Sequence, residues 1–549
     1  MIVRRSEWGD PLSQGWVAIG MNAAEYVLTG GLAVAGRDKP AIVSGDGSVT
    51  YGELAVRVSR FAAALRESGL NPGDRVAMLM LDHADLVALY LAIIAAGGIA
   101  ITVSTRATSD DLRHILAIVR PFAVVAESAF VPVVAAGMTP ETKLFLRERD
   151  MQSWAQRSET EFAPCARAPD DPAYWVMTSG TTGQPKAVEH RHDNVQACTD
   201  YLVHGLAATA ADRFFPTSRL NFAYALGVMF GTLRLGATLI LHERWPTPPS
   251  IAVTVELHRP SVVLSVPTLF HKLCESGFAP KSAFRAVRCY VSAGERLPPR
   301  IGAEWEKLTG RPIVDAMSCS ELIHKVFTNT IYVRRAGSSG RPLRGVEVRL
   351  IDHDGSEITQ PGCSGRLEVR APFLCAGYRL ADTPPHAPAH RPTERFRGEW
   401  FATGDEYLRD EDGFYHHCGR SDDMLKISGL WVSPSEIEDA LAGIPTIAEA
   451  AAVLSESAAG LSEIVLYVVA TSSTDSEAAL AAAREHLARK LPAFKLPRQY
   501  ALAAELPRTA TGKIQRHKLR AELQRTPRDR STASVDFLFS GSIGRILSA

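Results

Sequence analysis

The sequence lacks three features that would each indicate a specialised class of protein. Lysine plus arginine and aspartate plus glutamate both total 60, so the formal net charge is zero. This balance argues against nucleic acid or an anionic membrane surface as the main partner. No stretch reaches the roughly 18–20 uninterrupted apolar residues of a membrane span, and Met1 to Asp10 lack the apolar core of a signal peptide. We therefore expect a cytoplasmic protein with no membrane or nucleic-acid partner.

Cysteine is scarce and dispersed. The eight cysteines form no C-x-x-C pair and no ligand-like grouping with histidines. Such spacing fits a reducing compartment, and it excludes an obvious disulfide framework or zinc site.

Helical and strand patterns alternate along the first part of the chain. Glu53 to Leu70 and His83 to Ala96 have the apolar spacing of helices. Asp74 to Met80 and Ile99 to Val103 have the character of strands. This alternation predicts an α/β fold with parallel sheets covered by helices.

A chain of 549 residues is too long for one compact core, so we expect several domains. Val346 to Ile351 and Gly365 to Arg370 predict a small antiparallel β portion that closes the large domain. After Gly419 to Asp423, a helix start near Pro434 and a strand at Ile464 to Ala470 predict a small α+β domain. The predicted division is an N-terminal domain of residues 1–421, a C-terminal domain of residues 422–525 and a flexible tail of residues 526–549.

The segment from Thr178 to Lys186 reads TSGTTGQPK and carries the strongest functional signal. Its glycines and hydroxyl side chains can surround a triphosphate, and Lys186 adds a positive charge. The apolar stretch Ala173 to Met177 predicts that the loop leaves a buried strand. The G-x-x-x-x-G-K-[ST] spacing of the P-loop is absent. A flexible surface loop is the alternative interpretation.

This loop resembles the signature of the adenylate-forming superfamily, which includes acyl- and aryl-CoA ligases, nonribosomal adenylation domains and luciferases. The resemblance runs from Asn22 to about Arg516 and implies a small mobile C-terminal domain and a two-step reaction. A carboxylate attacks the α-phosphorus of ATP to give acyl-AMP, and a thiol then displaces AMP. The other matching segments, in family order, are Thr50–Leu54, Gly73–Val76, Ser292–Glu295, Ser318–Glu321, Thr403–Asp405, Gly419–Asp423 and Pro507–Lys513.

The resemblance implies specific roles for charged residues. Glu321 would help to hold Mg²⁺ beside the phosphates. Lys513 would bridge the carboxylate and the α-phosphate, and Lys186 would be a further catalytic cation. Asp405 and Arg420 would hold the ribose hydroxyls. Without the motifs, each of these would be interpreted as a solvated surface charge. The nucleotide-binding residues implied are Thr178, Ser179, Gly180, Thr181, Thr182, Gly183, Ser292, Ala293, Gly294, Glu295, Ser320, Asp405 and Arg420.

The second half-reaction requires the small domain to rotate about a hinge, for which Asp422 matches the family residue. That rotation would bring Gly429 beside the incoming thiol. The residues implied to line the thiol tunnel are Lys426, Ser428, Gly429 and Trp431.

Within the superfamily the chain is most similar to benzoate-CoA ligases and related aryl-CoA ligases. The similarity lies in Asn22–Tyr26, Phe222–Gly227, Ser320–His324 and Asp423–Pro434. Small residues next to an aromatic side chain leave a flat apolar slot suited to a ring. The alternative for Phe222 and Tyr224 is ordinary core packing, and His324 could equally be a core histidine. The candidate acid-binding residues are Asn221, Phe222, Ala223, Tyr224, Gly227 and His324.

Several positions depart from the aryl-CoA ligase pattern. Ala187 replaces the usual glycine after the loop lysine, and Glu189 stands where an apolar residue is typical. Asn221 occurs where aryl ligases often have phenylalanine, and its amide could donate to a polar ring substituent. These changes leave adenylation intact and argue against plain benzoate as the acid.

The predicted cofactors are ATP, Mg²⁺ and CoA, with a holo carrier protein as the alternative acceptor. Both acceptors end in phosphopantetheine, so the catalytic motifs do not separate them. Lys490, Lys495 and Arg498 are candidate contacts for the nucleotide phosphates of CoA or simply a solvated face. A catalytically silent homologue would be expected to lack Lys513, Glu321 or Asp405, and all three are present. The oligomeric state stays open, a homodimer included.

Overall fold

The structure is a computed structural model that describes residues 21–45, 47–158, 161–179, 185–279, 282–323, 325–384, 387–421, 425–427, 430–456, 462–471, 476–508, 514–525, 534–539 and 542–548. The chain divides into two compact units by its internal contacts. The first comprises Met1–Leu297, Ile301–Val348 and Val369–Phe401, and the second comprises Pro298–Arg300, Arg349–Glu368 and Ala402–Ala549. The domain boundaries expected from the sequence stay predictions.

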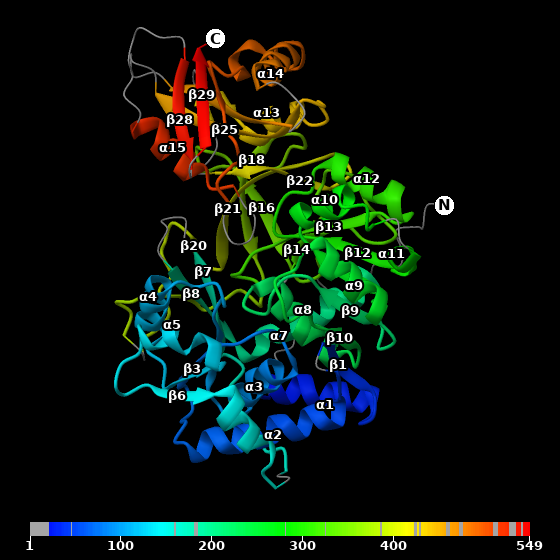
Figure 1. Ribbon diagram of the computed structural model, residues 1–549, viewed down its shortest axis with the longest axis vertical. Coiled ribbons are helices and arrows are strands. Elements are labelled where there is room, and N and C mark those ends of the chain that lie inside the picture. The colour runs from blue at the N-terminus through cyan, green and yellow to red at the C-terminus, as the bar shows by residue number, and fades with distance from the viewer. Residues whose placement is uncertain are drawn as a thin grey trace. The chain divides into compact units, whose positions relative to one another are not determined.

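Two large, mainly parallel sheets organise the first unit (Figure 1). In the described part of the chain, the nine-stranded sheet has the order β15 (Arg341–Pro342), β14 (Lys325–Thr328), β13 (Ile313–Ser318), β12 (Cys289–Ser292), β11 (Val262–Ser265), β9 (Arg213–Pro216), β10 (Thr238–Ile240), β1 (Pro40–Ser44) and β2 (Gly47–Thr50). The seven-stranded sheet has the order β19 (Gly377–Arg379), β8 (Pro185–Arg191), β7 (Pro172–Ser179), β4 (Ile99–Thr102), β3 (Arg75–Leu79), β5 (Ala123–Ala126) and β6 (Lys143–Leu146).

Helices fill the space between these sheets and cover their outer faces. The central core joins α3 and α8 to apolar residues of strands from both sheets. Every described residue of α3 except Asp85 is buried, which explains why this helix is apolar on all sides. The helices at the central core are α1 (Ala23–Ala35), α2 (Tyr51–Glu67), α3 (Ala84–Ala95), α7 (Val195–Asp200) and α8 (Ala223–Arg234).

Separate apolar clusters pack on the outer face of each sheet. On the nine-stranded sheet the covering helices are α9 (Pro248–His258), α10 (Pro267–Glu275), α11 (Ser282–Ala286) and α12 (Pro299–Thr309). On the seven-stranded sheet they are α4 (Ser109–Val119) and α5 (Val131–Ala135). The short α6 (Gln152–Ala155) instead adds Trp154 to the central core. The predicted α/β fold with parallel sheets covered by helices is therefore confirmed.

A smaller, antiparallel sheet contains the two segments that the sequence predicted as the closing β portion. Its order is β17 (Glu357–Ile358), β16 (Glu347–Ile351), β18 (Ser364–Arg370), β21 (Trp400–Arg409) and β20 (Phe396–Arg397), and β22 (Tyr415–Arg420) also pairs with β21.

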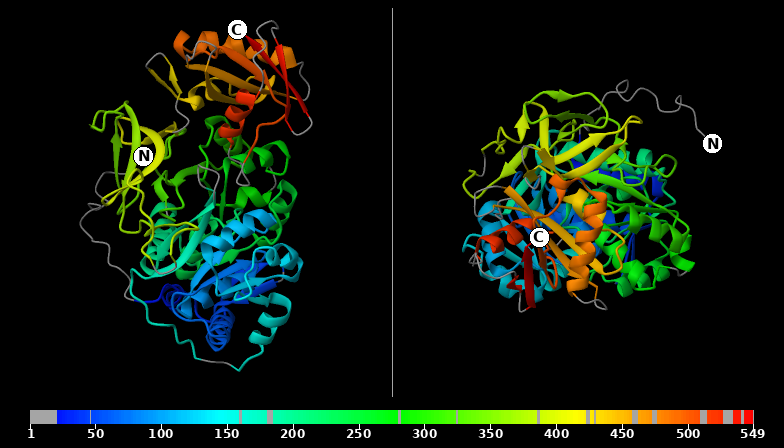
Figure 2. Two further views of the ribbon diagram at one scale, coloured as in Figure 1. Left: turned by 90° about the vertical axis from the view of Figure 1, so that its left-hand side faces the viewer. Right: turned by 90° about the horizontal axis from the view of Figure 1, so that it is seen from above.

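The C-terminal part of the second unit is an α+β arrangement, as predicted (Figure 2). Its sheet has the order β25 (Ile447–Glu456), β26 (Ser462–Ala470), β27 (Gln499–Leu502), β29 (Ser542–Ser548) and β28 (Ser534–Phe539). Alternate residues of β25 and β26 pack on α13 (Pro434–Ala440) and α14 (Ser476–Lys490) on one face, and on α15 (Arg516–Arg525) on the other. The region expected to be a flexible tail thus includes two strands, and its flexibility stays a prediction.

Three absences hold for the described residues. No helix there combines the length and apolar character needed to cross a membrane. None of the eight cysteines forms a disulfide. No group of three or more His, Cys, Asp or Glu side chains in the described ranges is arranged to hold a metal ion.

Candidate functional site

The glycine- and hydroxyl-rich loop joins two paired strands. β7 and β8 are antiparallel, and Thr178 pairs with Lys186 while Ser179 pairs with Pro185. The predicted loop residues Gly180, Thr181, Thr182 and Gly183 lie outside the described residues. The buried strand expected before the loop is present as β7, so the two ends of the loop are held together at the edge of the core.

Lys186 and Glu321 lie close together in the first unit, although they are far apart in the sequence. The Lys186 Nζ atom is 3.9 Å from Glu321 Oε1 and 3.5 Å from the centre of the Tyr378 ring. The Tyr378 hydroxyl donates a 2.7 Å hydrogen bond to Glu321 Oε1. Burial, with Glu321 close by, raises the pKa of Tyr378 well above its ordinary value, so the phenol stays a donor. A cation and a carboxylate are therefore held together at the ends of the loop.

Tyr378 was missed by the sequence interpretation. It belongs to β19, which pairs with β8 so that Tyr378 is opposite Val188. The same pairing explains Glu189, a departure from the family pattern. The Glu189 carboxylate is buried and accepts from Arg379 Nε at 2.7 Å and from Trp175 Nε1 at 3.0 Å. An apolar position has thus been replaced by a buried, fully paired carboxylate.

The turn that carries Glu321 is strained and tightly supported. Ile323 has a φ of 47°, which is an outlier for a β-branched residue. His190 Nε2 donates to the Ser320 carbonyl at 2.8 Å, and burial lowers the pKa of His190 to about 4, so the ring is neutral. A Cβ atom on Gly227 would lie 2.9 Å from the Ile323 carbonyl oxygen. Gly227, predicted as pocket wall, therefore also lets α8 approach this turn.

The predicted adenine-lining segment follows β12. Ser292 and Ala293 are buried, and Gly294 has a φ of 93°, a conformation that favours glycine. Glu295 accepts a 2.8 Å hydrogen bond from the Thr268 hydroxyl. The segment therefore forms an ordered turn at the end of a parallel strand, where ligands bind in open α/β sheets.

The predicted acid-binding segment begins helix α8. Asn221, Phe222, Ala223 and Tyr224 are all half-buried. The Tyr224 hydroxyl donates to the Val291 carbonyl at 3.3 Å, which ties the segment to the end of β12. Asn221 makes no hydrogen bond to another described side chain or backbone group. These residues thus share a region of the first unit with the predicted nucleotide segment.

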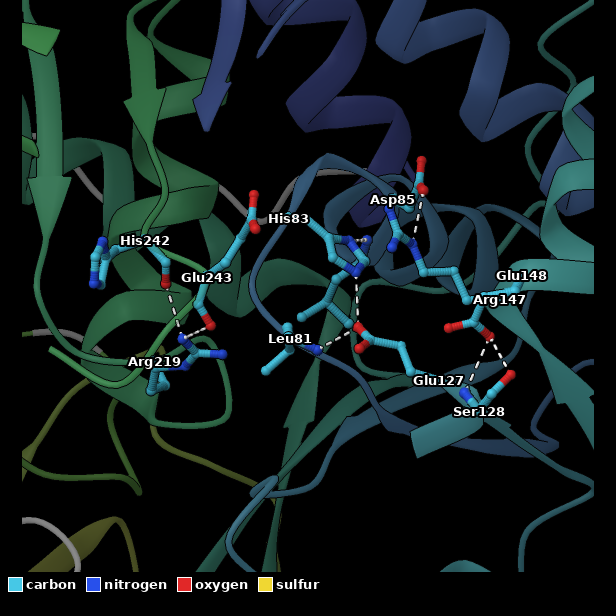
Figure 3. Close-up of polar contacts among 11 residues, drawn as sticks. Leu81, His83, Asp85, Glu127, Ser128, Arg147, Glu148, Arg219, His242 and Glu243 are labelled. Atoms are coloured by element: carbon cyan, nitrogen blue, oxygen red, sulfur yellow. Dashed lines mark hydrogen bonds and ion pairs between the residues drawn. The ribbon is translucent and has the colours of Figure 1, made fainter. Parts of the chain in front are cut away.

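A buried ion pair holds the loop before this segment. Arg219 Nη1 donates to the carbonyls of His242, at 2.8 Å, and Glu243 (Figure 3). Its Nε atom is 3.4 Å from Asp82 Oδ2, which also accepts from the Leu220 backbone N–H at 2.9 Å. Burial raises the pKa of Asp82 to about 6, and the Arg219 charge opposes this rise. The contacts join loops after strands of both large sheets, so no local sequence signal could have revealed them.

We expect the substitution Arg219→Met to destabilise the first unit by about 3–5 kcal/mol, because it leaves Asp82 buried without its cation. The folded pKa of Asp82 lies above its unfolded value, so its contribution favours folding at low pH and is lost as pH rises through about 6. The loss in the free energy of unfolding caused by Arg219→Met should therefore be larger at pH 8 than at pH 5. Urea unfolding midpoints of wild type and variant at the two pH values measure this difference.

The matched control is Arg149→Met, since Arg149 pairs with Asp150 but its side chain is 68% exposed. This change should leave the urea unfolding midpoint nearly unchanged at both pH values, because an exposed ion pair contributes little to stability. A deficit for Arg219→Met that is equally small, or that grows as pH falls, would show that the ion pair does not hold the loop.

The predicted ribose pair lies in the second unit. Asp405 on β21 and Arg420 on β22 are opposite each other, with Arg420 Nη1 donating to Asp405 Oδ1 at 3.0 Å and to the Thr403 carbonyl at 3.1 Å. His417 Nε2 is 3.5 Å from the same carboxylate oxygen. Gly404 has a φ of 78°, which fits the tight turn of the motif. The structure therefore brings this predicted pair together.

Other predicted residues cannot be placed or have other partners. His324, Asp422, Ser428, Gly429 and Lys513 lie outside the described residues. Lys426 and Trp431 are opposite each other in the hairpin of β23 (Leu425–Ile427) and β24 (Leu430–Val432). Lys495, a candidate CoA contact, is paired with Glu436 at 2.5 Å. That pairing weakens the case for Lys495 as a phosphate ligand.

Comparison with known proteins places this geometry in a family. Residues 32–379 match the model of the AMP-binding enzyme, and residues 436–513 match the AMP-binding enzyme C-terminal domain. The 3-hydroxybenzoate–CoA ligase of Aromatoleum sp. (strain CIB) is 36% identical over 516 residues, which is 92% of this chain and 97% of the relative.

Two solved structures are similar along most of their length. A benzoate CoA ligase from Burkholderia xenovorans LB400 is 32% identical with a TM-score of 0.82, covering 91% of this chain and 99% of that one. The anthranilate CoA ligase AuaEII, in complex with anthranoyl-AMP, is 28% identical with a TM-score of 0.84, covering 92% and 98%. The chain therefore belongs to the AMP-binding enzyme family of adenylate-forming ligases, as the sequence motifs predicted.

Proposed function

We propose that this protein activates an aromatic carboxylic acid with ATP and transfers the acyl group from acyl-AMP to the thiol of CoA. The observation that carries the proposal is the arrangement of Lys186, Glu321 and Tyr378 at the ends of the glycine-rich loop. Because the chain belongs to the AMP-binding enzyme family and is similar to aryl-CoA ligases, we interpret these three residues as part of the site where ATP reacts with the acid. Activation brings two anions together, so positive charge at the transferring phosphoryl group lowers the barrier.

Glu321 suits the role of a Mg²⁺ ligand. Mg²⁺ is commonly held by one or two carboxylates together with substrate phosphates, and it supplies Lewis-acid stabilisation of phosphoryl charge. Glu321 is one buried carboxylate, fixed by the Tyr378 hydroxyl, and no larger cluster of ligands accompanies it among the described residues. Lys186 would place its ammonium on the same phosphates.

The remaining nucleotide contacts are assigned by the same logic. Ser292, Ala293 and Gly294 would line the adenine, because the positive φ of Gly294 lets backbone approach a flat base. Asp405 would accept from the ribose hydroxyls and Arg420 would donate to them. Their mutual hydrogen bond orients both side chains before a nucleotide binds.

Acyl transfer to CoA is favoured over loading of a carrier protein because the relatives compared above are CoA ligases. For this step we propose a domain of residues 422–525 that turns about Asp422, with Lys426, Ser428, Gly429 and Trp431 along the thiol path. A homodimer stays open, and the elution volume of the purified chain in size-exclusion chromatography decides it.

The experiment that tests this function measures pyrophosphate release with ATP and Mg²⁺ across benzoate, hydroxybenzoates, aminobenzoates and aliphatic acids, with and without CoA. We expect an aromatic acid to be preferred and AMP release to require CoA. A preference for a saturated chain of six or more carbons would exclude the aromatic assignment. AMP release that responds to a holo carrier protein but not to CoA would move the acceptor to the alternative.

Asn221→Ala is expected to reduce the preference for a ring-substituted acid over benzoate by on the order of tenfold, the scale of one hydrogen bond lost from a half-buried amide. The motive is the half-buried position of Asn221 beside Phe222 and Tyr224, with no partner among the described groups. The ratio of kcat/KM values for pyrophosphate release measures it. An unchanged ratio would place Asn221 outside the acid pocket.

A further inference from the structure

Lys325 is a buried cation that the catalytic assignments leave unused. It is the first residue of β14 and only 4% exposed. Its Nζ atom lies 3.6 Å from the centre of the Tyr224 ring and 5.7 Å from that of Tyr201. Tyr224 belongs to the candidate acid pocket, and the short connection from β13 to β14 carries Glu321 and leads directly into Lys325. The ammonium is therefore beside the wall where the ring of an acid would lie.

The hydrogen-bonding capacity of this ammonium is poorly satisfied. It has three N–H donors, and the structure gives it one long hydrogen bond, 3.4 Å, to Ser318 Oγ. No ion pair joins it to a carboxylate in the described part of the chain, and Asp315 on β13 acts on it only through its longer-range charge. A buried charge without close acceptors is costly. A ligand that brings an acceptor would relieve that cost.

The charges around Lys325 determine which kind of hydrogen-bond acceptor on a ligand fits beside it. Burial lowers the pKa of Lys325 to about 7, and burial raises the pKa of Asp315 to about 8. Near neutral pH Asp315 is therefore largely protonated and Lys325 only partly charged, so the site lacks the full positive charge that a second, buried carboxylate on the ligand would need. A phenolic hydroxyl is neutral, accepts one hydrogen bond and keeps its own donor, so it fits this site better.

We propose that Lys325 is a second specificity residue, in addition to Asn221, and that it recognises a hydroxyl group on the ring of the aromatic acid. This inference rests on the proposed function, and it adds a residue that the motifs do not assign and identifies the ring substituent as a hydroxyl. The face of Tyr224 positions the ammonium through a cation–π contact, so the donor is already oriented before the acid binds. The unsatisfied donors then discriminate against the acid that lacks the hydroxyl.

The test compares kcat/KM for pyrophosphate release with benzoate, 3-hydroxybenzoate and 4-hydroxybenzoate in the wild type and in Lys325→Met. Methionine keeps the length of the side chain and removes its charge and donors. We expect the wild type to prefer one hydroxybenzoate, and the variant to lose that preference by about tenfold or more. Activation of benzoate, which has no ring hydroxyl, should fall less than activation of the preferred hydroxybenzoate. Lys325→Gln, which retains a donor, should keep part of the preference.

Lys143→Met is the matched control, because Lys143 also lies over an aromatic ring, Phe122 at 4.7 Å, but on an exposed surface. It should leave all ratios unchanged. Equal loss for every acid in Lys325→Met, or an unchanged ratio, would overturn the proposal and leave the proposed function intact. A wild type that does not prefer a hydroxylated acid overturns it without any variant, even if Lys325→Met fails to fold. Absence of activity with every aromatic acid would overturn the proposed function as well.

Discussion

Replacing Lys513 with alanine is expected to lower pyrophosphate release from ATP and the acid by about 10²- to 10³-fold, the cost of removing one preorganised charge from the transition state. Thioester formation from supplied acyl-AMP should stay largely intact. Lys513 follows Thr511 and Gly512 in the closing motif, and the resemblance assigns it to the first half-reaction only. Separate assays of the two half-reactions measure the difference.

Two comparisons make this result specific. Lys518→Ala removes an exposed lysine of the neighbouring helix α15 and should change neither half-reaction. Gly429→Leu should show the reverse pattern to Lys513→Ala, because it would obstruct the approach of the thiol. Equal loss of both half-reactions in Lys513→Ala would contradict a rotation of the small domain between them.

The second large effect is expected for Glu321→Gln, which should lower the rate of adenylation by about 10²-fold and weaken its Mg²⁺ dependence. The amide keeps the size of the side chain and can still accept from the Tyr378 hydroxyl. It removes the negative charge that we assign to the metal and that lies 3.9 Å from Lys186. A titration of activity against Mg²⁺ concentration measures both effects.

The substitution Tyr378→Phe tests whether the orientation of the Glu321 carboxylate matters separately from its charge. It removes only the 2.7 Å hydrogen bond to Glu321, so a loss of roughly five- to tenfold is expected. Glu306→Gln, in an exposed ion pair with Arg334, should have no effect. If Glu321→Gln retains normal activity and normal Mg²⁺ dependence, Glu321 is not a ligand of the catalytic metal ion.

The sequence by itself determined the family and the alternation of helices and strands. Apolar periodicity is a local property, so α2, β3, α3 and β4 could be predicted within a few residues of their ends. The catalytic motifs are also local, because each places its chemistry within a few consecutive residues. That is why Lys186, Glu321, Asp405 and Arg420 could be named before the fold was known.

Only the tertiary structure decided which distant side chains meet. Tyr378 reaches Glu321 because β19 pairs with β8, and Arg219 reaches Asp82 because loops from two sheets adjoin. Lys325 at the start of β14 is buried over Tyr224 at the start of α8. In the sequence Tyr378, Arg219 and Lys325 have the pattern of an ordinary charge or aromatic. Their environments depend on contacts between segments that are remote in the chain, and no local pattern encodes such contacts.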